Sequence, residues 1–233
     1  MWREQLAEYV KQNKPENKLP RDFFTRDGIT VAKELLGKEL VHETPEGTIC
    51  GIITEVESYM GIKDKGSHTY GGRRTERTEP MFHIGGTSYV YFTYGMYYCM
   101  NITSEQAENP QAVLIRSVVP ADEASGERML KLRMAVQTEK AQKRKAAKGE
   151  ALSDKDIQCM EKNTLKHLAD GPGKMCIAMG ITKADNDVDM VESHTFYVTE
   201  GIAVEPVEIK AGKRIGIDYA EEAADYLWRF YLE

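Results

Sequence analysis

Residues 54–61 read T-E-V-E-S-Y-M-G, and residues 66–78 read G-S-H-T-Y-G-G-R-R-T-E-R-T. Residues 81–101 continue with M-F-H-I-G-G-T-S-Y-V-Y-F-T-Y-G-M-Y-Y-C-M-N, and V-L-I-R closes the stretch at 113–116. An apolar strand with paired acids therefore precedes a basic glycine loop and a tyrosine-rich segment. Carboxylates can activate water, guanidinium groups bind phosphate, and aromatic rings stack on nucleobases. Their combination in one short stretch favours chemistry on a nucleic-acid base.

The start of this stretch predicts a β-hairpin that carries the paired acids. Residues 40–42 and 48–56 are rich in β-forming side chains and flank the turn signal P-E-G. The second of these strands ends in alternating apolar and polar residues. Because side chains alternate between the two faces of a strand, Glu55 and Glu57 are expected to share one face.

The rest of the stretch predicts a loop and further strands. Residues 61–79 have no hydrophobic period and predict a long loop, which in folded proteins is usually functional or disordered. Residues 88–102 predict two strands joined by a tight turn at 94–96, and residues 112–118 predict another buried strand.

Outside this stretch the sequence predicts helices and short strands. Helices are expected at about 2–13, 30–36 (with Gly37 as its C-cap), 122–137, 154–168 and 175–179. Short strands are expected at 196–198, 203–207 and 214–217, while 140–149 is either a basic helix or a linker and 219–230 either a helix or extended. Since strands and helices do not alternate regularly, we expect an α+β fold with one mixed domain at 19–233. Residues 1–18 form an N-terminal extension, and about 138–167 form a polar helical insert.

The composition is that of a globular protein without a membrane span. The 233 residues are 41% hydrophobic and 29% charged, and the longest apolar run is far shorter than the roughly 18 residues of a membrane helix. The first ten residues carry charges where a signal peptide has its apolar core. The four cysteines lack C-x-x-C spacing, which argues against zinc and iron–sulfur sites. A cytoplasmic protein with free, mainly packed thiols is expected.

The charge distribution is polarised. The net charge is −6 with a pI of about 5.5, whereas nucleic-acid binders are usually basic. Residues 63–77, however, carry five cations against two acids, a local net of +3. One positive face can therefore still meet DNA, with affinity that is sensitive to salt.

Each motif on its own has an ordinary structural explanation. Glu57 alone is more simply a solvent-facing strand acid, although burial would raise its pKa toward that of a general base. The tyrosines between residues 89 and 98 suit a β core, but each buried hydroxyl would then need a partner. Gly71-Gly72-Arg73-Arg74-Thr75 is either a flexible loop or a phosphate-binding segment, and residues 170–174 are either a turn or a phosphate site. P-loop and zinc-deaminase motifs are absent from the sequence.

Taken together, these segments resemble the 3-methyladenine DNA glycosylases of the alkyladenine (methylpurine) type. The resemblance spans roughly residues 19–232. Besides the stretch quoted first, it rests on L-L-G at 35–37, S-V-V-P at 117–120, D-G-P-G-K at 170–174, R-I-G-I at 214–217 and W-R-F-Y at 228–231. Val56 and Ser58 depart mildly from the usual family strand. The family has a curved antiparallel sheet with flanking helices and a protruding β-hairpin that inserts into the DNA minor groove.

The resemblance also implies residue roles. Glu57 would be the general base that activates water, with Arg116 and the backbone carbonyl of Ile215 placing that water. The remaining expected positions are Tyr59, His68, Tyr91 and Asn101 around the extruded base, Tyr94 in the gap it leaves, Met81 and Phe82 near the opposite strand, and Arg73, Thr75, Arg77 and Lys174 along the backbone. Neither a metal nor an organic cofactor is expected.

The implied reaction is excision of alkylated purines from double-stranded DNA, which leaves an abasic site. An N3- or N7-alkylated purine is cationic and already a good leaving group, so extrusion, stacking and an activated water suffice. Activity on hypoxanthine and etheno-adenine stays open. The matched positions hold no lysine for a Schiff-base step. The resemblance implies a monomer, nucleoid-associated in a bacterium. A non-catalytic module that binds damaged DNA or RNA is the alternative, and a small-molecule enzyme on a related sheet is a third class supported by fold alone.

Overall fold

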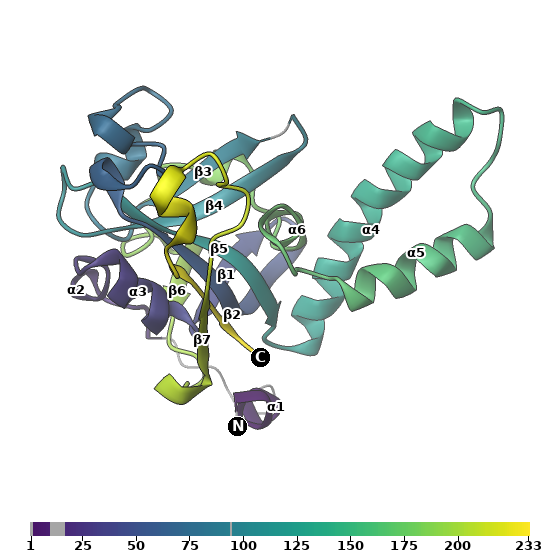
Figure 1. Cartoon of the computed structure of the whole chain (residues 1–233). Coiled ribbons are helices and arrows are strands. Elements are labelled where there is room, and N and C mark those ends of the chain that lie inside the picture. Colours follow the sequence, from purple (N-terminus) through teal and green to yellow (C-terminus); the bar gives the residue numbers. More distant parts are fainter. Residues whose placement is uncertain (1, 10–16, 94) are drawn as a thin grey trace.

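The computed structural model describes residues 2–9, 17–93 and 95–233, and its centre is an eight-stranded sheet (Figure 1). The strand order is β3-β4-β5-β2-β1-β6, while β8 pairs with β2 and β7 pairs with β8, all antiparallel. The strands are β1 (Glu39–Thr44), β2 (Gly47–Tyr59), β3 (Ser88–Thr93), β4 (Tyr97–Ser104), β5 (Gln111–Pro120), β6 (Phe196–Thr199), β7 (Ile209–Gly212) and β8 (Arg229–Leu232). The predicted α+β fold with an antiparallel sheet is confirmed.

β2 organises the sheet because it is long enough to have two neighbours along one side. Its first half, residues 47–52, pairs with β1, and residues 55–57 pair with β8. β5 runs along the other side, and the register between β2 and β5 shifts around Glu55. Such a bulge bends a strand and changes where its side chains point. Glu55 and Glu57 therefore lie where β2, β5 and β8 meet.

The β3–β4 hairpin has the predicted position. Its pairing runs from Ser88 opposite Ile102 to Thr93 opposite Tyr97. The Met96 N–H donates to the Thr93 carbonyl (3.1 Å), and Gly95 has a φ of 65°, a left-handed conformation that glycine adopts without strain. The prediction for Tyr94 falls outside the described residues.

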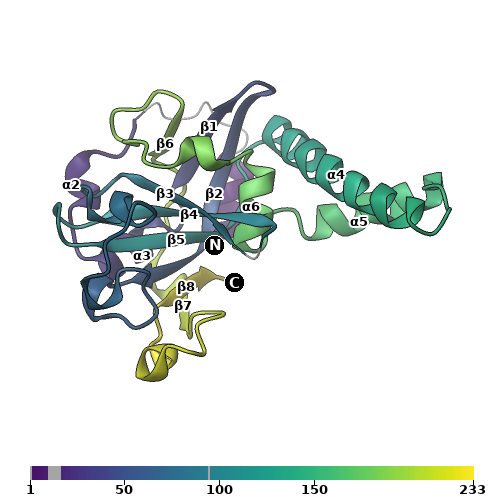
Figure 2. The same cartoon turned by 90° about the horizontal axis from the view of Figure 1, so that it is seen from above.

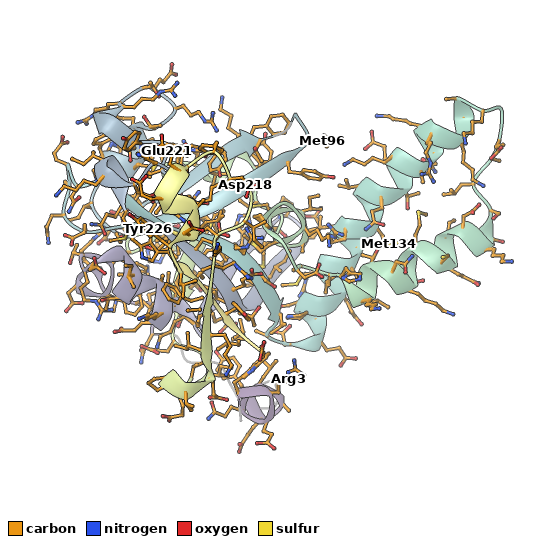
Figure 3. All side chains as sticks on the ribbon, in the orientation of Figure 1. Arg3, Met96, Met134, Asp218, Glu221 and Tyr226 are labelled. Carbon is orange, nitrogen blue, oxygen red and sulfur yellow. The ribbon has the colours of Figure 1, made fainter. Side chains whose placement is uncertain are left out.

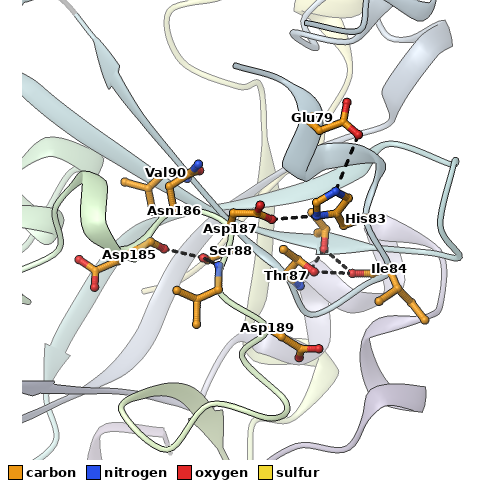
Figure 4. Close-up of polar contacts among 12 residues, drawn as sticks. Glu79, His83, Ile84, Thr87, Ser88, Val90, Asp185, Asn186, Asp187 and Asp189 are labelled. Carbon is orange, nitrogen blue, oxygen red and sulfur yellow. Dashed lines mark hydrogen bonds and ion pairs between the residues drawn. The ribbon is translucent and has the colours of Figure 1, made fainter. Parts of the chain in front are cut away.

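The outer edge of β3 is covered by the chain segment 185–190 (Figure 4). The buried Ser88 hydroxyl donates to the Asp185 carbonyl (2.5 Å) and accepts from the Val188 N–H (2.9 Å). The Val90 N–H donates to the side-chain oxygen of Asn186 (2.9 Å). An uncovered edge strand would expose unpaired backbone groups, so this segment both satisfies β3 and anchors the base of the hairpin.

Helices flank the sheet, and two of them project from it. The helices are α1 (Trp2–Tyr9), α2 (Arg21–Phe24), α3 (Gly28–Leu35), α4 (Glu123–Ala146), α5 (Asp154–Lys166) and α6 (Pro172–Ala178). Asp27, Asp122 and Ser153 cap α3, α4 and α5 through their side chains, as expected for these residue types. α3 packs on β2 and α6 on β4 and β5, whereas α4 and α5 form an arm that extends away from the sheet (Figures 1 and 2).

Most predicted elements are present, with changed boundaries. α3 is followed by Gly37 at a φ of 85°, consistent with the predicted helix end. The ambiguous segment 140–149 continues α4 as far as Ala146. Residues 219–230 form a 3₁₀ turn (Glu221–Asp225) and the start of β8. The N-terminal helix ends at Tyr9 in the described part of the chain and is docked on the body, since Trp2 Nε1 donates to the Glu233 carbonyl (2.8 Å).

Two predicted strands are wrong. Apolar residues alternate around 203–207 because Ile202 and Val204 pack on the core. Residues 203–207 nevertheless form no strand pairing, and Pro206 starts a 3₁₀ turn. Residues 214–217 are irregular because Arg214 is committed to a buried ion pair, described below, instead of a strand pairing. None of the helices in the described part of the chain is long and apolar enough to cross a bilayer.

The covered edge of β3 leads to a prediction about stability. Ser88→Ala removes one donor and one acceptor and leaves two partly buried backbone groups without their side-chain partner, so we expect the free energy of unfolding to fall by about 1–3 kcal/mol. Urea denaturation measures this change. The control is Thr48→Ala, which loses a hydrogen bond at an exposed site and should stay within about 0.5 kcal/mol of the parent. Equal stability of the two variants would contradict the prediction.

Candidate active site

Glu57 is a fully buried carboxylate held by three donors. Its Oε1 accepts from the Ile215 N–H (2.7 Å) and lies 3.2 Å from Arg116 Nη1, while its Oε2 accepts from the Tyr59 hydroxyl (2.9 Å). Arg116 also donates through Nε to Glu55 Oε1 (3.0 Å). The shared contact with Arg116 agrees with the prediction that the two acids lie on one face.

The environment of Glu57 favours proton uptake in spite of these donors. Burial is the largest effect and raises the pKa, Arg116, Ile215 and Tyr59 oppose it, and Glu55 adds to it. The pKa of Glu57 is therefore raised from its ordinary value. A carboxylate that is both fixed in place and more basic than usual suits a general base.

A cavity of about 240 Å³ lies next to this carboxylate. Tyr59, Arg116 and Ile215 line the cavity and also contact Glu57. Its further lining includes His68, Tyr91 and Asn101, so the four residues expected to enclose a base converge on one space. The volume is slightly below the ~300–1,000 Å³ of typical ligand pockets. It suits one flat ring system better than a whole nucleotide.

The cavity walls are mainly aromatic and apolar, and Arg116 is the charged residue among them. The rings of His68 and Tyr91 meet edge to face with centroids 4.7 Å apart, and Tyr89 lies 5.2 Å from Tyr91. His68 Nδ1 shares a 2.9 Å hydrogen bond with the Tyr89 hydroxyl. Burial, with Arg77 and Arg73 nearby, lowers the pKa of His68 to about 4. A neutral imidazole and tyrosine faces can accept a cationic guest.

A buried ion pair connects the segments around the cavity. Arg214 donates to both carboxylate oxygens of Asp64 (2.5 and 2.7 Å), and both side chains have zero exposure. The guanidinium also donates to the Ser58 carbonyl (3.0 Å) and lies over the ring of Tyr59 at 4.7 Å. Loop 61–79, the end of β2 and the C-terminal segment are thereby held together.

The basic loop 61–79 contains short 3₁₀ turns at 61–63 and 70–72 and leads into a third at 79–82. Three of the four expected backbone contacts are exposed in this loop. These are Arg73, Thr75 and Arg77. Arg77 lies 5.0 Å from the Tyr91 ring, which links the loop to the cavity wall. The fourth, Lys174, is on α6 and donates to Asp170 (2.9 Å).

Two expected DNA contacts are less accessible than predicted. Met81 is 2% exposed and lines the cavity, and Phe82 is 6% exposed beneath the guanidinium of Arg74. The exposed apolar side chains near the β3–β4 turn are instead Phe92 (52%) and Met96 (57%), the latter labelled in Figure 3. In the sequence, only their position beside a predicted turn indicated that these two side chains would be exposed.

Other residues of the cavity were not singled out by the sequence. Among them are Cys99, Leu114, Ile217 and Tyr219, while Tyr89 and Pro172 belong to segments that the sequence indicated without a role in the pocket. Strand alternation places Tyr89 and Asn101 on the same side as Tyr91 and Cys99, because Asn101 is paired with Tyr89 and Cys99 with Tyr91. That alternation could have indicated Tyr89 and Cys99. Ile217 and Tyr219 come from an irregular segment, which has no such pattern.

The cysteines and acids show no metal-site geometry. All four cysteines are free, and three of them are buried. The described residues contain no group of three or more His, Cys, Asp or Glu side chains placed to hold a metal ion.

Comparisons with known proteins show the family of the chain. The profile of the family described as methylpurine-DNA glycosylase (MPG) matches residues 22–233. A protein of Clostridium acetobutylicum named "Putative 3-methyladenine DNA glycosylase" is 46% identical over 218 residues, which are 93% of this chain and 94% of that protein. Proteins with the same name from Clostridium novyi (45% over 219 residues, 93% and 95%) and Desulfitobacterium hafniense (42% over 216 residues, 93% and 95%) are also similar.

The neutral state of His68 leads to a prediction about acid stability. The unfolded chain takes up this proton near pH 6.5 and the folded chain only near pH 4, so acidification through this window favours unfolding. We expect the parent to lose about 2–3 kcal/mol more than His68→Gln between pH 7 and pH 4, allowing for the partial exposure of the ring. Urea denaturation at a series of pH values measures the difference. Parallel pH curves for the two proteins would show that His68 is not held neutral.

Proposed function

Because the chain belongs to the methylpurine-DNA glycosylase family, we propose that it flips alkylated purines out of double-stranded DNA and hydrolyses their N-glycosidic bond with a water activated by Glu57. The product is an abasic site. The observation that carries this proposal is the fully buried Glu57, held by two hydrogen bonds and an ion pair beside an aromatic cavity.

In the proposed reaction the alkylated base sits in the cavity among Tyr59, His68, Tyr91 and Asn101. The cationic base leaves with the electrons of the C1′–N bond, and an oxocarbenium-like sugar develops. Glu57 takes a proton from the attacking water, and its charge opposes the positive charge on the sugar. Arg116, Tyr59 and the Ile215 N–H keep the carboxylate in place. The expected role of the Ile215 carbonyl in placing water remains part of this proposal.

The cavity favours cationic lesions such as 3-methyladenine and 7-methylguanine. Neutral lesions such as hypoxanthine and etheno-adenine need a proton on the leaving base. The pKa of His68, about 4, makes it a poor proton donor at neutral pH, and those of Tyr59 and Tyr91 are raised by burial. We therefore propose that neutral lesions are the poorer substrates.

The β3–β4 hairpin is the proposed element that enters the DNA. Tyr94 keeps its proposed role of filling the gap left by the flipped nucleotide. Exposed Phe92 and Met96 on either side of it support this role, because apolar side chains can wedge between base steps. Met81 and Phe82 keep at most an indirect role toward the opposite strand, since both are buried.

Arg73, Thr75, Arg77 and Lys174 would contact the phosphate backbone. We propose a cytoplasmic monomer, as the family resemblance implies. A non-catalytic binding module would need no buried carboxylate, so the burial of Glu57 favours the enzyme over that alternative.

Removal of the proposed base gives the direct test. We expect Glu57→Gln to slow release of 7-methylguanine from a duplex by about 10²–10⁴-fold, since the general base is lost, while the variant still binds DNA. Single-turnover assays with mass spectrometry of the released base, together with a binding assay, measure both properties. Glu55→Gln is the matched control on the same strand face and should retain most of the activity. Full base release by Glu57→Gln would rule out this residue as the base.

The pH profile gives a second test. Glu57 acts as its carboxylate and its pKa is raised, so the single-turnover rate on 7-methylguanine should rise with pH along a limb centred above 4.5. It should then stay level, because a cationic leaving group needs no general acid. The limb should persist in Glu55→Gln. A bell-shaped profile would instead show that a general acid takes part.

A further inference from the structure

The α4–α5 arm has no role in the reaction described so far. It projects from the body beside the β3–β4 hairpin, while the basic loop 61–79 lies on the other side of that hairpin (Figures 1 and 2). One side of the arm's longer helix is already occupied. Met134 of α4 faces α5 (Figure 3), and the ammonium of Lys145, eleven residues on, lies 2.8 Å from Asp156 of α5.

A second row of side chains on α4 begins opposite the hairpin. Arg133, Gln137, Lys140 and Arg144 follow one another at spacings that return to one side of a helix. The first three line a groove of about 490 Å³ together with Thr93 and Tyr97 of the hairpin and residues 171–174 at the start of α6. The Lys140 ammonium lies 4.7 Å from the Tyr97 ring. The row therefore starts at the base of the hairpin and continues along the arm.

Arg133 has the environment of a residue that binds an anion. It is 6% exposed, lines the groove, and its buried Nε has no hydrogen-bond partner among the described residues. A buried donor left unpaired is costly, so such a group calls for an explanation, and a bound anion is one. The carboxylate whose charge acts on Arg133 is that of Asp170. This carboxylate is already bonded to Lys174 (2.9 Å) and His167 (2.6 Å). With Lys140 and Lys174 beside it, the groove has an excess of positive charge.

The location of the groove identifies the anion. Thr93, Cys99 and Pro172 line both the groove and the cavity proposed to hold the flipped base. An anion in the groove would thus lie next to the flipped nucleotide. Arg133 and Arg144 are eleven residues apart, which is about 16 Å along the helix and long enough for several phosphates at ~3.4 Å per strand.

We propose that Arg133, Lys140 and Arg144 of α4, with Lys174 of α6, bind the phosphodiester backbone of the duplex beside the flipped nucleotide. This inference rests on the proposed function, because the hairpin and the base cavity set where the duplex lies. The net charge of −6 supports it, since an acidic protein must bind a polyanion through local groups of cations. The duplex is then held from both sides of the hairpin, by loop 61–79 and by α4.

The salt dependence of binding to an undamaged duplex of about 25 base pairs tests this proposal. The double variant Lys140→Gln, Arg144→Gln should bind about tenfold more weakly and lower the slope of log K against log salt by about 1.8. The matched control is Lys155→Gln, Lys162→Gln, which removes the same charge from exposed positions of α5 and should change neither value. Arg133→Gln tests the groove separately, with circular dichroism to check folding.

The possible results separate the two proposals. Equal slopes for the parent and the Lys140, Arg144 variant would overturn the role of α4, and so would an equal loss in the α5 control. Because no base is released from undamaged DNA, failure of the Glu57 test would leave this readout intact. Conversely, active base release with an unchanged salt slope would reject only the α4 contact.

Discussion

The site depends on the buried ion pair between Asp64 and Arg214. Breaking such a pair by removing one partner typically costs about 3–5 kcal/mol, because the other charge stays buried without compensation. Here the pair also sets geometry. Arg214 binds the backbone at the end of β2 and stacks on Tyr59, and its neighbour Ile215 donates to Glu57. Three segments far apart in the sequence are thus fixed around one carboxylate.

The proposed base combines two opposing effects. Burial makes the charged form of Glu57 costly, and its three donors lower that cost without cancelling it, so the pKa stays raised. The same desolvation keeps His68 neutral. The cavity offers a cation the faces of its tyrosines and a neutral imidazole beside the buried carboxylate, while Arg116 in its lining is paired with that carboxylate. This electrostatic character supports the proposed excision of alkylated purines.

The prediction from sequence succeeded where local pattern and tertiary environment agree. The hairpins, the loop at 61–79 and helix α3 have strong turn or cap signals, and the four expected pocket residues line one cavity. It failed at 203–207, where the apolar residues reflect packing on the core without strand pairing. It also failed at 214–217, where Arg214 is held in a buried ion pair. Met81 and Phe82 were expected to contact DNA, but helical turn 79–82 folds them inward.

By itself, the sequence determined that an acid-bearing strand, a basic loop and a tyrosine-rich hairpin follow one another, because turn residues and two-residue periodicity are local properties. It also carried the family resemblance. Only the tertiary structure decided that Glu57 is buried, that Ile215 meets it through its N–H, and that Arg133 is left with an unpaired donor beside the hairpin. Burial and hydrogen-bond pairing depend on which distant segments come together, and no periodicity in the chain encodes that.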